Sequence, residues 1–94
     1  MERHRGSAYQ RFANYCNERD VDENDAVIAM TVTCHIDNLH LIEKLGHGAG
    51  MLTHEPCNIL QRAGVLNVGT GSGSSRVDWE KVRHYMSIGE KLRK

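Results

Sequence analysis

The chain has 94 residues, its twelve basic side chains balance its twelve acidic ones, and 39% of its residues are hydrophobic. This length predicts one small domain, residues 1–94, with a small core, which favours binding over catalysis. The neutral balance excludes the overall basic field that draws a protein onto nucleic acid, and no stretch approaches the ~18 apolar residues of a membrane span.

Three cysteines, Cys16, Cys34 and Cys57, cannot all pair within one chain. Cys16 and Cys34 fall on apolar patterns, which predicts that both side chains are buried. The N-terminus lacks the apolar run of a secretory signal. Reduced thiols without such a signal predict a cytoplasmic, reducing setting.

The first predicted helix covers about residues 8–18. Ser7 and Gln10 have the spacing of a capping box at its start. Residues 1–6 in front of this helix are predicted to be a flexible tip. The apolar side chains of the helix recur at helical spacing, at Tyr9, Phe12, Ala13 and Cys16.

The segment 26–45, AVIAMTVTCHIDNLHLIEKL, fits two predictions. The acidic residues before it, Lys44 in its last turn and Gly46 after it are typical of one long helix. The alternation of apolar residues over 28–36, many of them β-branched, is typical of a strand. We favour the helix because its start and end signals agree. Such a helix would be apolar on most sides and therefore nearly buried.

A short helix is predicted after the turn at Gly46. It begins at Thr53 or His54, carries Pro56 in its first turn and ends at Gly64. With the last helix described below, the sequence predicts a mainly α, four-helix domain. The alternative is an α+β domain with short strands at 27–36 and 65–68.

The last predicted helix starts at the S-x-x-D signature of Ser75 and Asp78 and runs to about Arg93. Together its two apolar seams span more than one face, which predicts a homo-oligomer or a partner groove. A terminal helix packed across two neighbours fits the same pattern. The first seam is Trp79, Val82 and Met86, and the second is Tyr85, Ile88 and Leu92.

A Gly- and Ser-rich loop covers residues 69–75 and follows the apolar run VLNV. A loop between a strand and a capped helix presents backbone N–H groups to an anion, so this order is typical of a site for a nucleotide-like ligand. A flexible linker is the alternative interpretation. The residues that would bind the anion are Gly69, Gly71, Ser72, Gly73, Arg76 and Lys81.

The run AGVLNVGTGSG, residues 63–73, resembles the first motif of the S-adenosylmethionine-dependent methyltransferases, V-L-D-x-G-x-G-x-G. The resemblance implies a Rossmann-like sheet whose loop holds the cofactor. Asn67 stands where that family has an acidic residue, and only about twenty residues follow the loop, whereas the fold needs several more βα units. We therefore assign no family and expect no cofactor.

His54 and Cys57 lie three residues apart and would form one half of a zinc site, with Cys34 and His40 or His47 as the other half. Zinc needs four such ligands in a tetrahedral arrangement, and no tight C-x₂-C pair is present. The spacing therefore predicts no bound metal.

A polar stripe runs along one face of the predicted long helix. It places a carboxylate beside an imidazole, the groups of a general acid–base pair. No nucleophile or oxyanion donor accompanies them, so the pattern favours a solvated helix face and predicts no catalytic residue. The stripe consists of Asp37, His40, Lys44 and His47.

These features predict a small non-enzymatic regulatory or inhibitory protein that acts through protein–protein contacts. The profile is similar to that of small proteins with which viruses and mobile elements block a host factor. One alternative is a binder of a nucleotide-like anion at the Gly- and Ser-rich loop. Another is a zinc-stabilised nucleic-acid-binding module.

Overall fold

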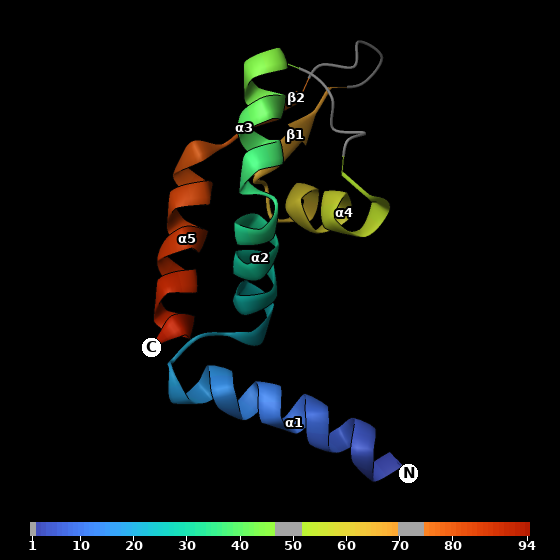
Figure 1. The fold of residues 1–94 in the computed structure, drawn as a ribbon, viewed down its shortest axis with the longest axis vertical. Helices are drawn as coiled ribbons and strands as arrows, with labels where there is room; N and C mark the ends of the chain where they lie inside the picture. Colours follow the sequence, from blue (N-terminus) through green and yellow to red (C-terminus); the bar gives the residue numbers. More distant parts are fainter. Residues whose placement is uncertain (1, 47–51, 70–74) are drawn as a thin grey trace.

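The computed structural model describes residues 2–46, 52–69 and 75–94, with side chains from residue 8 onward. Within these ranges it has five helices and a two-stranded antiparallel sheet, which confirms the mainly α prediction. The elements, coloured along the chain in Figure 1, are α1 (Glu2–Glu18), α2 (Glu23–Cys34), α3 (Ile36–Leu45), α4 (His54–Arg62), β1 (Leu66–Val68), β2 (Ser75–Val77) and α5 (Trp79–Arg93).

The long helix predicted over 26–45 is two helices, α2 and α3, that meet at His35. The backbone of His35 leaves the helical conformation, with φ −116° and ψ 21°, and its N–H is shared between two carbonyls of the preceding turn. The hydroxyls of Thr31 and Thr33 donate to carbonyls one turn earlier, at 2.8 and 2.9 Å, and such bonds bend helices. The β-branched run thus forms a broken helix, and the alternative of a strand at 27–36 is wrong.

Two helix ends follow the sequence signals, whereas the start of α1 does not. α3 ends at Gly46, whose φ of 77° and hydrogen bond to the carbonyl of Ile42 form a left-handed cap. The turn after α4 contains Gly64 at φ 79°. α1 begins at Glu2, so Ser7 lies inside the helix and not at its N-cap. Residues 2–6, predicted to be a flexible tip, are helical.

β1 and β2 form a hairpin in which Val68 lies opposite Ser75. β1 corresponds to the short strand that the α+β alternative placed at 65–68. Because Ser75 belongs to β2, the prediction that it caps the last helix is wrong. The N-cap of α5 is Asp78, whose carboxylate accepts from the N–H of Lys81 at 3.3 Å.

The core has two parts, and α5 contributes to both. α5 runs antiparallel beside α2, as Figure 1 shows. The larger part joins α2, α3, α4, the hairpin and α5 around fully buried side chains that include Val32, Leu39 and Leu60. The smaller part holds α1 on the ends of α2 and α5 and consists of Cys16, Val21, Ala26, Ala29 and Leu92.

α1 is attached mainly through its C-terminal half. The hydroxyl of Tyr15 donates to the carbonyl of Leu92, and the Arg19 guanidinium lies 3.5 Å from the centre of the Tyr15 ring. The rest of α1 extends away from the other helices (Figure 1). The radius of gyration, 15.0 Å, accordingly exceeds the ~12 Å typical of a compact domain of this length. None of the described helices is both long and apolar enough to cross a membrane.

Candidate functional site

The Gly- and Ser-rich loop connects two paired strands. Residues 70–74, and with them Gly71, Ser72 and Gly73, lie outside the described residues. The loop joins β1 to β2 of one hairpin, so the predicted order of strand, loop and helix is wrong. β2 and Asp78 stand between the loop and the first residue of α5 in the chain.

The two basic residues assigned to this loop lie on different elements, Arg76 on β2 and Lys81 on α5. Arg76 is exposed on β2. The ammonium of Lys81 lies beside Gly64, where a Cβ would come within 2.5 Å of Nζ. β1 separates Gly64 from Gly69, which is the last described residue before the loop. The predicted anion site thus stays a prediction, with Gly69, Arg76 and Lys81 on separate segments of the described chain.

Both apolar seams of α5 pack against the core, with Val82 and Leu92 buried and the other four side chains partly buried. Val82 belongs to the larger core, and Trp79 and Met86 pack against it. Leu92 belongs to the smaller core, which Ile88 and Tyr85 cover. No α5 side chain is among the large exposed hydrophobic residues of the described part of the chain. This packing fits the alternative of a terminal helix that packs across two sets of neighbours.

The polar stripe lies on α3 and faces solvent. Asp37, His40 and Lys44 are exposed, and His47 lies outside the described residues. The His40 ring stacks on the indole of Trp79, with 4.6 Å between ring centroids and 27° between the planes. His40 therefore helps to pack α3 against the start of α5, a contact between distant residues that helical spacing could not predict.

The predicted halves of a zinc site do not meet. Nε2 of His54 lies 3.2 Å from the amide nitrogen of Asn58, and the Cys57 sulfur accepts from Gln61 at 3.1 Å. Both pairs lie along α4. Across residues 8–46, 52–69 and 75–94, no three His, Cys, Asp or Glu side chains are placed to hold a metal ion together.

The largest candidate site is an apolar strip on the outer face of α2. We define the apolar strip as Phe12 of α1 together with Val27, Met30 and Cys34 of α2, which are spaced at i, i+3 and i+7. Met30 and Val27 are 45% and 37% exposed. Cys34 is exposed as well, so the prediction that it is buried is wrong. α5 packs against α2 at Thr33, whose hydroxyl contacts the Met86 sulfur, and it leaves Val27, Met30 and Cys34 exposed.

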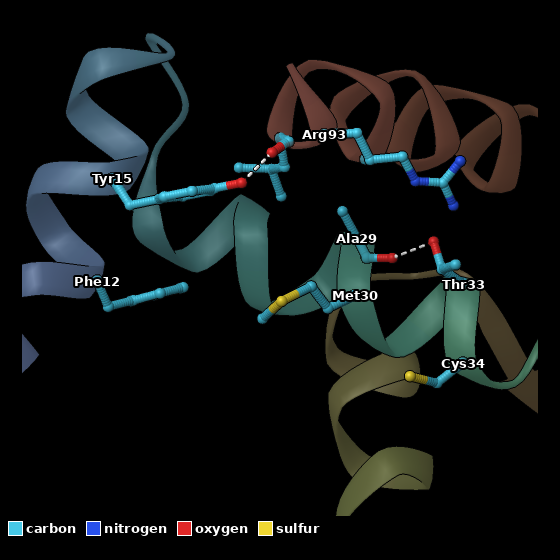
Figure 2. A pocket seen from close by; sticks show the side chains of 9 residues that line it. Phe12, Tyr15, Ala29, Met30, Thr33, Cys34 and Arg93 are labelled. Atoms are coloured by element: carbon cyan, nitrogen blue, oxygen red, sulfur yellow. Dashed lines mark hydrogen bonds between the residues drawn. The ribbon is translucent and has the colours of Figure 1, made fainter. Parts of the chain in front are cut away.

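The largest hollow beside the strip, of about 600 Å³, lies where α1, α2 and α5 meet. Figure 2 shows Phe12 pointing from α1 toward Met30, with Cys34 farther along α2 and Arg93 of α5 at the edge. Ala29, Gly89 and Leu92 also line this hollow, and its walls are almost wholly apolar.

Two further hollows adjoin the strip. One, of about 230 Å³, lies between α2 and α4, where Pro56 and Ile59 face Val27, Met30 and Cys34. The other, of about 480 Å³, lies at the start of α2, between Phe12 and Val27. The strip is therefore a ridge with a depression on either side and at one end.

Charged groups lie around the strip and not on it. The carboxylates of Asp22 and Glu23 line the hollow at the start of α2, and that of Glu55 lines the hollow beside α4. A hydrogen bond to Glu23 is the main cause that raises the pKa of Tyr9, and the negative charge of Glu23 raises it further. The only cation of these three linings, Arg93, lies 3.7 Å from Glu90.

Comparison with protein-family models, with curated proteins and with solved structures finds no significant match for this chain. Any function must therefore be inferred from its own residues.

Sequence reasoning missed the strip, although a signal was present. The apolar positions of segment 26–45 cover most sides of a helix, more than its neighbours bury. The apolar pattern of this segment is thus a signal for exposed apolar surface. Because of its two apolar seams, the last helix is predicted to carry that surface instead.

Proposed function

We propose that this protein is a small, non-enzymatic regulatory or inhibitory protein that binds an amphipathic helix of a protein target on its apolar strip. The observation that carries the proposal is the exposed ridge of Val27, Met30 and Cys34 with apolar hollows on both sides. Contiguous exposed apolar surface is typical of sites for protein partners.

The shape of the strip favours a helix as the bound element. Helices pack by fitting ridges of side chains into grooves, and the α2 ridge with its flanking hollows is one half of such a contact. A single enclosed cavity with several converging polar groups would favour a small molecule instead. Here, three adjoining hollows are spread along two turns of α2.

The side chains of the strip suit a binding surface. Met30 is flexible and polarizable, and it adapts to partners of different shape. Phe12 is half-buried against the smaller core, and its open side adds aromatic surface, of the kind that contributes strongly to binding at interfaces. The free thiols of Cys16, Cys34 and Cys57 support a reducing, intracellular setting for this interaction.

Selection of peptides tests the proposal. A displayed library of helical peptides with randomised surfaces is selected on the immobilised full chain, and the enriched peptides are titrated against variants. We expect apolar residues at i, i+3 or i+4, and i+7 in these peptides. Met30→Asp should weaken their binding by about 30-fold, the effect of losing an interface hot spot.

The matched control is Leu41→Asp. Leu41 is 42% exposed and lies on α3, so this variant adds the same charge to an equally exposed apolar site outside the strip. Circular dichroism checks that both variants fold. Equal loss of binding in both variants, or no enriched peptides at all, would contradict the proposal.

A further inference from the structure

We infer that the helix bound on the apolar strip is basic, with Lys or Arg side chains at one end and along one edge of its apolar face. This inference rests on the proposed function and adds the charge class of the partner. It starts from the three carboxylates, of Asp22, Glu23 and Glu55, that line the hollows beside the strip.

The carboxylates lie where the edges of a bound helix would pass. Asp22 and Glu23 stand at the start of α2, beside Phe12 and Val27. The Asp22 carboxylate also caps α2 by accepting from the N–H of Asn24 at 3.0 Å. Glu23 and Glu55 therefore carry most of the negative charge that is open to a partner. Glu55 stands in the first turn of α4, beside Pro56 and Ile59, and is exposed. A helix packed on the ridge would therefore have carboxylates at one of its ends and along one of its sides.

The positive charge near the strip is weaker. Arg93 is the one cation in the three linings, and its ion pair with Glu90 offsets part of its charge. The basic side chains of Arg19, Lys91 and Lys94 gather in a separate hollow where α1 and α5 end, and this hollow contains no residue of the strip. The chain is neutral as a whole, yet the surroundings of the strip are acidic.

Complementary charge selects among partners that share an apolar face. Carboxylates around an apolar surface attract a basic helix and repel an acidic one, and this preference weakens as salt rises. Since each ion pair would be exposed to solvent, we expect each one to change the affinity by about two- to five-fold. Several charges together should give at least about ten-fold discrimination.

The test uses two designed helical peptides of about 15 residues, long enough to form a helix. Both carry the same leucine face, one with lysines on its edges and the other with glutamates. Their dissociation constants for the full chain are measured by fluorescence polarisation at low and high salt. We expect the lysine peptide to bind at least about ten-fold more tightly, with a difference that shrinks at high salt.

Charge-removing variants of the protein locate the effect. Glu55→Gln should weaken binding of the lysine peptide by about two- to five-fold, and Arg93→Gln should strengthen its binding. The matched control is Glu80→Gln, which removes an exposed first-turn carboxylate from α5 instead of α4 and should leave binding unchanged.

The outcomes separate this inference from the proposed function. If the glutamate peptide binds as tightly as the lysine peptide and both are weakened by Met30→Asp, the strip is a helix site but the inference about charge is wrong. If light scattering shows a dimer that Met30→Asp dissociates, a second copy occupies the strip and the inference is also overturned. If neither peptide binds and the library selection fails, the proposed function itself is wrong.

Discussion

Gly89 of α5 faces Thr33 of α2 with room for one more methyl group. A Cβ on Gly89 would meet the Thr33 hydroxyl oxygen at 3.5 Å, an ordinary van der Waals contact. Glycine inside a helix costs about 0.5–1 kcal/mol relative to alanine, because the unfolded chain loses more conformational freedom. Gly89→Ala should therefore raise the free energy of unfolding by about this amount, as measured by urea denaturation.

Gly46→Ala provides the opposite case. Gly46 has φ 77°, and apart from its chain neighbours no described atom lies within 4 Å of the position that a Cβ would take, so backbone strain is the main cost of this change. It should lower the free energy of unfolding by about 1 kcal/mol. The two variants should thus shift stability in opposite directions. If Gly89→Ala lowers the free energy of unfolding instead, α2 and α5 lie closer together than the structure has them.

Asp78 and Ser75 should respond to alanine in different ways. The carboxylate of Asp78 caps α5, and its removal should lower the free energy of unfolding by about 1 kcal/mol. The Ser75 hydroxyl is buried and has no hydrogen-bond partner among the described residues, so Ser75→Ala should leave stability within about 0.5 kcal/mol or raise it. If urea denaturation shows a larger loss of stability for Ser75→Ala than for Asp78→Ala, Ser75 and not Asp78 is the cap of α5.

The three cysteines should react with iodoacetamide at well-separated rates. Cys34 is exposed and should be alkylated first, and Cys57 is partly covered and should follow. Cys16 is fully buried, and burial is the main cause that raises the pKa of its thiol. The reagent therefore reaches this sulfur slowly, and a smaller fraction of the thiol is in the reactive thiolate form. Peptide mass spectrometry over time measures the order, and early alkylation of Cys16 would contradict the packing of α1.

Tyr15→Phe should loosen α1 selectively. This variant removes the hydroxyl that donates to the carbonyl of Leu92, a bond worth about 1 kcal/mol. Hydrogen exchange should become faster in α1 while α2 and α5 keep their protection. Arg11→Lys is the control, since Arg11 is an exposed residue of the same helix and this variant should change stability by less than about 0.5 kcal/mol. Equal effects of the two variants would mean that α1 is held by other contacts.

The sequence by itself determined the helical class and several helix ends. Gly46 and Gly64 end or follow helices because their positive φ angles suit glycine, and Pro56 sits in the first turn of α4 as expected. These features depend on a few neighbouring residues, so local chemistry is sufficient to predict them. Even the break at His35 has a local cause, in the β-branched residues and the hydroxyl bonds of Thr31 and Thr33.

Tertiary structure alone decided which apolar faces are buried. The pairing of Val68 with Ser75 moved Ser75 from a helix cap into a strand and separated the Gly- and Ser-rich loop from the start of α5. Packing of α5 across two clusters covered both of its seams and left Met30 and Cys34 on the open side of α2. Periodicity shows that a helix has an apolar face, but burial depends on which distant segment reaches that face, and no local pattern records this.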